Sequence, residues 1–371
     1  MRILQVVSLL DPDGAYGGPA RVALNTSAEI LRRGHDVTVA AATRGYPVGS
    51  TTLDGVPVEL FDARMLMPTN KFYGMGAPDL SRWFRANGRA YDVVHIHFAR
   101  DLVVLPIAMS ARRQRIPYVL QTHGMVIPSQ HPLSAPLDVT CTRRALHDAG
   151  AVCYLTAQEK GQLTTVAGSR LRLFQLGNGV PEYAGPPRRS GPPEVLFAAR
   201  LASRKKPLSF VAMARMLLMS GHRACFTLLG PDGGQGPAVT AATVAHPSIN
   251  WDGAVEPREL PTRMAAANVF VLPSVREPYP MAVLEAMSVG LPVVVTDDCG
   301  LAPMVDRTGC GIVTDPSPPS LAAAVGKLLD DEFLAADMGR RGREVARSEF
   351  SMSAIGDRLE QAYSRVAEGA R

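Results

Sequence analysis

Short apolar runs recur along the first half of the chain, each of about the length of a buried strand. These runs are Ile3–Leu9, Asp36–Ala41, Val56–Phe61, Val93–His97, Tyr118–Gln121 and Ala151–Leu155. Segments with apolar residues at helical spacing lie between several of them, such as Pro19–Arg33 and Leu102–Arg115. Strands that alternate with helices predict a parallel sheet with helices on both of its faces.

The alternating pattern begins again after a segment rich in Gly and Pro, 177–193, which marks a domain boundary. The second series of strands is Glu194–Ala198, Cys225–Leu229, Ile249–Asp252, Val269–Leu272, Pro292–Thr296 and Gly311–Val313. We therefore predict an α/β protein with two doubly wound domains, 1–180 and 181–350. Such domains bind ligands at the carboxyl ends of their strands, so a cleft between them is the expected site.

Two glutamates eight residues apart give the most specific chemical signal. Glu277 lies in a polar loop after the strand Val269–Leu272, and Glu285 lies inside the helix that follows. The start of that helix presents free N–H groups and a positive dipole end, which suit a phosphate. A carboxylate within the helix can accept hydrogen bonds from sugar hydroxyls. The pair therefore predicts a ligand with both phosphate and sugar, although glutamates near a helix start also occur for helix stability alone.

Four cations follow the first strand of the second half, namely Arg200, Arg204, Lys205 and Lys206. Such a cluster at a strand end can neutralise a diphosphate without a metal ion. A solvated basic turn is the alternative.

Glycines follow strands at two further places. Gly17 and Gly18 open a helix after the first strand, with Pro19 in the first turn. Paired glycines let the backbone approach a phosphate closely, although a tight turn alone would explain them. The spacing is not that of the dinucleotide fingerprint. The segment 228–234 is a second loop of this kind.

Histidines lie at the ends of two predicted strands. His123 stands beside Gly124, after the strand Tyr118–Gln121, and is placed to meet a ligand or to have a structural role. His95 and His97 alternate along one strand and so share a face. No third ligand of suitable spacing follows, so a zinc site is not expected. His97, nearer the strand end, is expected to contact an acceptor.

The stretch 269–296 resembles the E-x7-E signature of retaining family-4 glycosyltransferases. The shared features are Val-Leu-Pro-Ser before Glu277, Leu-Glu-Ala-Met around Glu285 and Gly-Leu-Pro-Val-Val after it. The resemblance covers nearly the whole chain and is strongest over 194–300. It implies the GT-B fold, with an acceptor-binding Rossmann-like domain, a nucleotide-sugar-binding Rossmann-like domain and a C-terminal helix, 351–371, that crosses back to the first domain.

The resemblance also assigns site residues. In the family a Gly-Gly loop, matched by Gly17 and Gly18, lies against the donor diphosphate and the acceptor. His123 would approach the transferred sugar or phosphate. Arg200 and Lys205 match the family's basic pair, which binds the diphosphate. Lys206 stands where glycine is usual, which leaves open whether Lys205 or Lys206 reaches the phosphate.

The remaining sugar-donor site is implied in the same way. Gly230 and Val255 match backbone positions near the nucleotide. Glu277 would bind the donor sugar and Glu285 the ribose of the nucleotide. The residues between them complete the site, and Pro280 stands where many members have glycine; these are Pro278, Tyr279, Pro280, Met281 and Ala282.

The implied activity is transfer of a sugar from a nucleotide-diphosphate sugar to the hydroxyl of a sugar or lipid-linked acceptor, with retention. Synthesis of an envelope polysaccharide, a glycolipid or a related glycoconjugate is the expected setting. The proposed catalytic groups are His123, Arg200, Lys205 and Glu277, with no cofactor and no divalent metal. A sugar phosphorylase of the same fold and a non-catalytic nucleotide-sugar-binding subunit are the alternatives.

The amino-acid composition limits the class of protein to which the chain can belong. The chain is 46% hydrophobic and 20% charged, as in soluble globular proteins. Its five cysteines form no Cys-x-x-Cys pair, which favours a cytoplasmic protein without disulfides or zinc. The apolar run at the start is too short to span a membrane and is interpreted as a first strand.

Charge is uneven along the chain. Residues 1–180 hold 19 Lys and Arg against 13 Asp and Glu. This excess can favour peripheral contact with an anionic membrane or a phosphorylated acceptor, or can simply be a solvated surface. Nucleic acid is not an expected partner, because no basic run with interleaved aromatics occurs. The helix Leu80–Asn87, with Trp83 and Phe84, is expected to face a core rather than a membrane.

Overall fold

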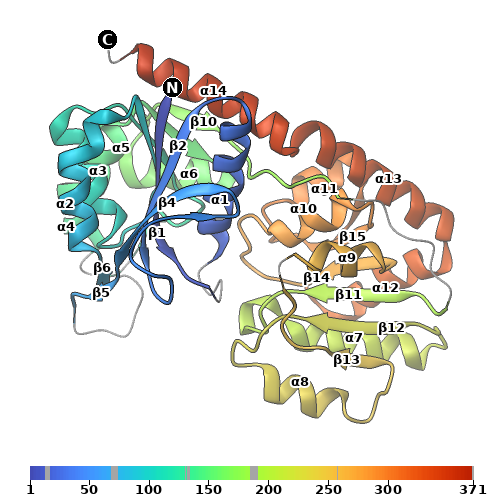
Figure 1. The fold of residues 1–371 in the computed structure, drawn as a ribbon. Coiled ribbons are helices and arrows are strands. Elements are labelled where there is room, and N and C mark those ends of the chain that lie inside the picture. The colour runs from blue at the N-terminus through green and yellow to red at the C-terminus, as the bar shows by residue number, and fades with distance from the viewer. Residues whose placement is uncertain are drawn as a thin grey trace. The chain divides into compact units, whose positions relative to one another are not determined.

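The computed structural model describes residues 1–12, 17–67, 74–129, 131, 134–183, 191–256 and 258–369. The chain divides into two compact units. The first unit is Met1–Gly179 together with Met352–Arg371, and the second unit is Val180–Ser351. Each unit has a parallel or mostly parallel sheet with helices packed against it (Figure 1), and this confirms the predicted fold class.

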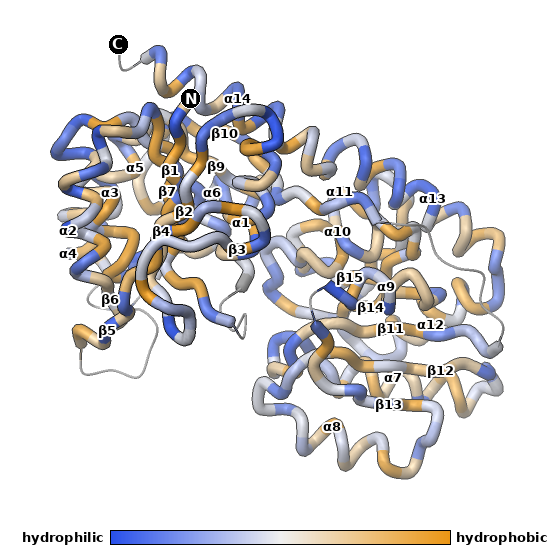
Figure 2. Tube along the Cα trace, viewed as in Figure 1, coloured by the Kyte–Doolittle hydropathy of each residue, from blue (hydrophilic) through white to orange (hydrophobic). Residues whose placement is uncertain are grey.

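The sheet of the first unit has the strand order β10-β9-β8-β7-β1-β2-β4-β3, and only the edge pair β3–β4 is antiparallel. Its strands are β1 (Arg2–Leu10), β2 (Asp36–Thr43), β3 (Gly49–Leu53), β4 (Val56–Asp62), β7 (Val93–His97), β8 (Tyr118–Gln121), β9 (Ala151–Tyr154) and β10 (Leu173–Gln175). A separate hairpin joins β5 (Arg64–Met65) and β6 (Met75–Gly76). Figure 2 shows the central strands as the most hydrophobic part of this unit.

Alternate residues of β1 enter different cores, as expected for a strand covered on both faces. Leu4 and Val6 join the cluster that includes Leu80 and Phe84 of α2, while Ile3 joins a cluster with the C-terminal helix. Phe84 is fully buried, so α2 faces the core as predicted. The helices of this unit are α1 (Gly17–Arg32), α2 (Pro78–Asn87), α3 (Val104–Gln114), α4 (Ser134–Leu137), α5 (Arg143–Asp148), α6 (Ala157–Ala167) and α14 (Met352–Glu368), with a π-helical turn at Asp138–Thr142.

The C-terminal helix α14 is held on the first unit by charge as well as by packing. Arg33 follows α1 and donates to Asp357 and to Glu360, at 2.7 Å each. His35 contacts the other oxygen of Glu360 at 2.7 Å. Tyr363 is fully buried and lies 2.7 Å from Nδ1 of His95 on β7. These contacts fix α14 across the sheet of the first unit.

The sheet of the second unit has the order β13-β12-β11-β14-β15-β16 and is parallel throughout. Its strands are β11 (Glu194–Ala198), β12 (Cys225–Leu229), β13 (Ile249–Trp251), β14 (Val269–Leu272), β15 (Val293–Thr296) and β16 (Gly311–Thr314). The helices are α7 (Pro207–Met219), α8 (Gly236–Thr243), α9 (Leu260–Ala265), α10 (Met281–Ser288), α11 (Ala302–Thr308), α12 (Pro318–Asp330) and α13 (Glu332–Glu349). One continuous core joins both faces of this sheet.

The strand order identifies where each unit can bind a ligand. In the second unit the chain moves outward from β11 in one direction and from β14 in the other, and in the first unit the reversal lies between β1 and β7. At such a reversal the loops after the two strands separate and leave a crevice at their carboxyl ends.

Candidate functional site

The loops at the reversal in the second unit carry the charged residues singled out in the sequence. Arg200, Arg204 and Lys205 follow β11, and Glu277 follows β14. Lys205 donates from Nζ to Oε2 of Glu277, and Arg204 donates from Nη1 to the same oxygen at 3.0 Å. The Lys205 and Glu277 side chains are only 14% and 9% exposed, whereas Arg204 is half exposed. Two cations and one carboxylate therefore meet at the expected crevice.

Burial and the contact with Glu277 have opposite effects on the pKa of Lys205. Burial lowers the pKa of Lys205, and the carboxylate of Glu277 works in the opposite direction. The two positive groups exceed the single negative group they bind. The loop therefore has a net positive charge that suits a diphosphate.

The backbone of Glu277 is fixed by the loop after β15, which sequence patterns did not identify. Glu277 forms a parallel β-bridge with Cys299, and its carbonyl accepts from the N–H of Gly300 at 2.8 Å. A Cβ at Gly300 would lie 1.9 Å from the carbonyl oxygen of Pro278, so only glycine fits. The available signal was a glycine a few residues beyond a predicted strand.

Gly230 closes a neighbouring part of the same edge. Its φ is +135°, and an added Cβ would lie 2.1 Å from the carbonyl oxygen of Ala199. Its N–H donates to Gly253 at 2.7 Å, and its carbonyl accepts from Nε1 of Trp251 at 2.9 Å. The glycine thus ties together the loops after β11, β12 and β13. Arg200 lies exposed in the first of these loops, and Val255 is half-buried beyond the third.

The segment after Glu277 leads directly into α10. Pro280 is the N-cap residue with extended backbone, and its side chain provides no cap, so the first-turn N–H groups have no side-chain acceptor from that position. Met281 and Ala282 form the first turn, while Pro278 and Tyr279 are half-buried before it. Glu285 follows one turn later and is only 2% exposed.

Lys206 adopts the left-handed conformation, with φ +53° and ψ +46°. It is exposed at the N-cap of α7, whereas Lys205 turns toward Glu277. Among the two lysines, Lys205 is therefore the one at the crevice. A left-handed position favours glycine, which gives a physical reason for the residue usual in the family.

Replacing Lys206 by glycine is expected to raise the free energy of unfolding by about 0.5–1 kcal/mol, because the strain of a left-handed side chain is removed. Urea denaturation at neutral pH is the measurement. Lys206→Ala removes the same charge but keeps Cβ, so it should give no gain. Equal stabilisation by both substitutions would show that charge, not backbone strain, is responsible.

In the first unit, His123 follows β8 in a left-handed turn, with φ +50°. Glu159 of α6 holds both sides of this turn, since its Oε1 accepts from Thr122 Oγ1 and from the N–H of Gly124, each at 2.5 Å. Its Oε2 accepts from the N–H of Leu155 at 2.6 Å. The carboxylate is 2% exposed. Sequence reasoning missed Glu159, which thus fixes where the half-buried His123 ring is presented.

The expectation that His97 contacts an acceptor is wrong in this structure. His97 is 1% exposed, and its two ring nitrogens lie 2.8 Å from Gln5 and 2.7 Å from His123. The ring of His95 lies parallel to that of His97 with centroids 4.8 Å apart. His97 therefore contacts His123 within the protein interior and is not exposed to a ligand.

Gly17 begins α1, as the glycine pattern predicted. A Cβ at Gly18 would meet no described residue within 4 Å, so packing against the described part of the chain does not require glycine there. Close approach of a ligand is one reason for a glycine at such a place. Ala15 and Tyr16, which precede Gly17 in the sequence, lie outside the described part of the chain.

Over the described ranges, no group of three or more His, Cys, Asp or Glu side chains is arranged to hold a metal ion. The helices found in those same ranges include none long and apolar enough to cross a bilayer.

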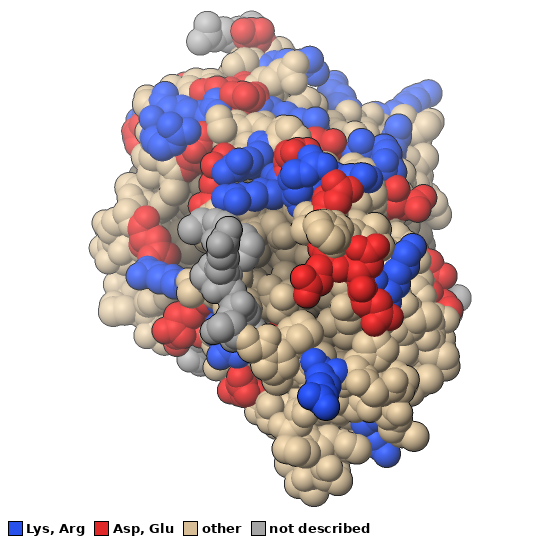
Figure 3. Space-filling model, turned by 90° about the vertical axis from the view of Figure 1, so that its right-hand side faces the viewer, with Lys and Arg blue, Asp and Glu red and all other residues tan. Residues whose placement is uncertain are grey.

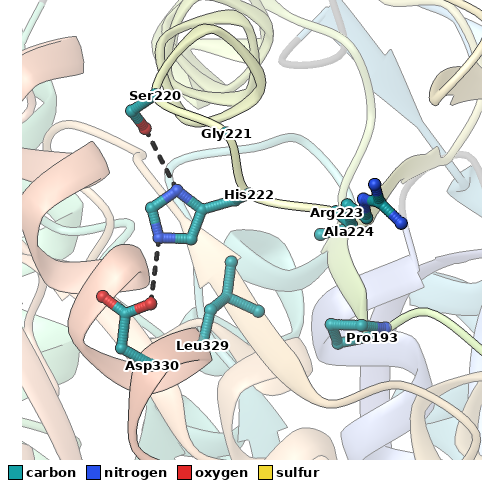
Figure 4. Close-up of a pocket in the computed structure, with 8 residues that line it drawn as sticks. All are labelled: Pro193, Ser220, Gly221, His222, Arg223, Ala224, Leu329 and Asp330. Carbon is teal, nitrogen blue, oxygen red and sulfur yellow. Dashed lines mark hydrogen bonds and ion pairs between the residues drawn. The ribbon is translucent and has the colours of Figure 1, made fainter.

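A separate pocket of about 450 Å³ lies near the amino ends of β11 and β12. Figure 4 shows His222 between Ser220 and Asp330, with nitrogens 3.0 Å and 3.2 Å from them. The trio has the composition of a hydrolytic triad. However, Ser220 donates its hydroxyl proton to the carbonyl of Leu217 at the end of α7, and Asp330 is 74% exposed. The group therefore caps the end of α7. It lies at the amino ends of the strands, whereas Lys205 and Glu277 lie at their carboxyl ends.

Basic and acidic side chains are interleaved over the upper part of the face drawn in Figure 3. On α13, Arg340 pairs with Asp337 at 2.5 Å and with Glu344 at 2.9 Å. Arg341 pairs with the same Asp337, so these two arginines have acidic partners within their own helix.

Both units match known families. Residues 183–345 match the family described as Glycosyl transferases group 1, and residues 17–179 match the Glycosyl transferase 4-like domain. An alpha-D-kanosaminyltransferase of Streptomyces kanamyceticus is 26% identical, with 68% of this chain and 71% of that protein covered. A glycogen synthase of Mycobacterium tuberculosis is 25% identical, with 100% and 96% covered.

Solved structures agree on the fold. The structure of Anabaena Alr3699/HepE in complex with UDP and glucose superposes with a TM-score of 0.78 at 17% identity, covering 98% of this chain and 99% of that one. A sucrose-phosphate synthase from Thermosynechococcus elongatus gives the same TM-score and identity over 100% of both chains.

Proposed function

Since the chain belongs to the family-4, group 1 glycosyltransferases and has the GT-B fold, we propose that it transfers a sugar from a nucleotide-diphosphate sugar to a hydroxyl acceptor with retention. The observation that carries the proposal is the contact of Lys205 and Arg204 with Glu277 at the strand reversal of the second unit. In the proposal, the two cations bind the diphosphate and Glu277 binds the sugar, and their contact supports a ligand that has both groups.

The chemistry follows from charge. When the bond between the sugar C1 and the diphosphate oxygen breaks, negative charge grows on the leaving diphosphate. Arg200, Lys205 and the first-turn N–H groups of α10 would stabilise that charge in the transition state. The acceptor oxygen forms the new bond to C1 on the same face, and its proton passes to the departing phosphate oxygen. Glu277 would hold the sugar hydroxyls during this exchange.

The other predicted residues have positioning roles in the proposal. Glu285 would accept hydrogen bonds from the ribose, and the loops at Gly230 and Val255 would lie against the nucleotide. Gly17, Gly18 and His123 of the first unit would bind the transferred sugar, its phosphate or the acceptor. These assignments rest on the family resemblance and on the position of each residue at the carboxyl edge of its own sheet.

The names of the relatives indicate chemically diverse acceptors. The acceptor proposed for this chain is therefore a broad class, a sugar or a lipid-linked sugar. A solved structure of this fold holds UDP and glucose, which makes UDP-glucose the first donor to test. A role in the cell envelope, a cytoplasmic location and peripheral contact with an anionic membrane through the first unit stay predictions.

The test is a screen of UDP-, GDP- and ADP-sugars by thermal shift, followed by incubation of the stabilising donor with candidate acceptors. Release of nucleoside diphosphate together with a glycosylated product of unchanged anomeric configuration supports the proposal. Phosphate-dependent cleavage of a glycoside, releasing a sugar 1-phosphate, would instead identify a phosphorylase. Donor binding with no turnover on any acceptor would favour a non-catalytic subunit.

Activity is expected to survive EDTA, because Arg200, Arg204 and Lys205 provide the positive charge that a metal would otherwise supply. The assay is initial rate after chelation and desalting. One Asp-x-Asp spacing does occur, at Asp11 and Asp13 after β1, with Asp13 outside the described residues. Full loss of activity that manganese restores, and that Asp13→Asn reproduces, would contradict metal independence.

A further inference from the structure

A chain of buried hydrogen bonds begins at Thr26 on α1. Its hydroxyl donates to the carbonyl of Val22 at 2.7 Å, one turn earlier in the helix. A hydroxyl has one proton, so a threonine that donates to its helix can only accept from other groups. Of the amide of Gln5 on β1, Nε2 lies 3.2 Å and Oε1 lies 3.4 Å from this hydroxyl, and only the NH2 group can donate to an oxygen that accepts. Thr26 therefore fixes the orientation of the Gln5 amide, with the NH2 group toward Thr26.

This orientation directs the carbonyl oxygen of Gln5 toward the next member of the chain. Oε1 of Gln5 lies 2.8 Å from Nε2 of His97, and both residues are almost completely buried. A carbonyl oxygen only accepts, so His97 must have its proton on Nε2.

The two histidine rings are neutral in this environment. Burial lowers the pKa of His97 well below its usual range and the pKa of His123 to about 3. A neutral imidazole has one N–H and one lone pair. Nδ1 of His97 is consequently an acceptor, and Nε2 of His123, 2.7 Å away, must be the donor.

The remaining nitrogen of His123 is Nδ1, which the described residues leave without a hydrogen-bond partner. We propose that Thr26, Gln5 and His97 fix His123 in its Nε2–H tautomer, so that Nδ1 offers a lone pair to a hydroxyl of the bound sugar. Thr26, Gln5 and His97 are then positioning residues. The part of this inference that concerns the sugar rests on the proposed function.

The tautomer is measured without substrate, by long-range ¹H–¹⁵N correlation spectra of the full chain labelled in histidine. The His123 signals are those lost in a His123→Asn variant. The wild type should show a pyrrole-type Nε2 and a pyridine-type Nδ1 for His123. In Gln5→Met the acceptor for His97 is gone, so both tautomers of His123 should be populated. In Thr26→Val the Gln5 amide can rotate by about 180°, so both tautomers of His123 should again be populated. Thr26→Ser keeps the hydroxyl and should match the wild type.

Activity is the second readout. Gln5→Met should lower kcat/KM on the order of tenfold, because the misplaced proton removes one hydrogen bond to the substrate, and Thr26→Ser should leave it unchanged. A proton on Nδ1 in the wild type, or an unaltered tautomer in Gln5→Met, would overturn the proposal. A changed tautomer with undiminished kcat/KM would overturn the role of Nδ1 toward substrate. Failure of the proposed function itself is seen separately, as a wild type that transfers no sugar.

Discussion

Replacing Lys205 by methionine is expected to lower kcat/KM by roughly 30- to 1000-fold, equivalent to about 2–4 kcal/mol of transition-state stabilisation. Methionine keeps an unbranched apolar side chain and lacks the ammonium group, with its charge and its N–H donors. In the structure the ammonium group is 14% exposed and binds Glu277, so water cannot replace it well at the departing diphosphate. The effect should fall on turnover, since the charge to be stabilised grows during bond breaking.

Lys206→Met is the matched control, because it removes the neighbouring charge from an exposed position that does not face Glu277. It should leave kcat/KM within about threefold of wild type, as expected for a surface charge. Lys205→Met is expected to fold, because Glu277 still has Arg204 as a cationic partner. Thermal denaturation checks this. Similar losses in both variants would mean that the loop acts only through its net charge.

The fold was largely predictable because buried parallel strands have a clear sequence pattern. Runs such as Val93–His97 and Val269–Leu272 are apolar on both faces and stand between helical segments, and the structure has strands with those bounds. The strand β3 was missed because Gly49–Leu53 is polar and mostly exposed at the sheet edge. The three-residue strand β10 was too short to give a pattern.

The candidate site was predictable as a set of strand ends but not as a set of contacts. Lys205 and Glu277 lie in the loops after the neighbouring strands β11 and β14, and a sequence can suggest such positions. The sequence gives no sign that Glu159 binds the turn at His123. That contact joins helix α6 to the loop after β8 and arises from tertiary packing alone. The error at His97 has a related cause. Alternation along a strand tells which face a side chain occupies, but not how deeply neighbouring elements bury it.

The two glutamates of the signature are expected to act on different parts of the ligand. Glu285→Ala should weaken binding of the free nucleoside diphosphate by about 1.5–3 kcal/mol, or roughly 10- to 150-fold, since hydrogen bonds from the ribose to a charged acceptor are lost. Titration calorimetry with the nucleotide of the best donor is the measurement. Glu285 is 2% exposed, so Glu285→Gln, which fills the same space, is needed to separate the lost charge from a cavity.

Glu277→Gln should leave that affinity within about threefold, because the free nucleoside diphosphate lacks the transferred sugar that this residue would bind. The carboxylate also neutralises part of the charge of Arg204 and Lys205, so its removal cannot weaken the attraction of these cations for a diphosphate. Turnover should nevertheless fall on the order of 100-fold, since the transferred sugar loses the group that orients it. If calorimetry finds that Glu277→Gln weakens the nucleotide and Glu285→Ala does not, the assigned roles of the two residues are reversed.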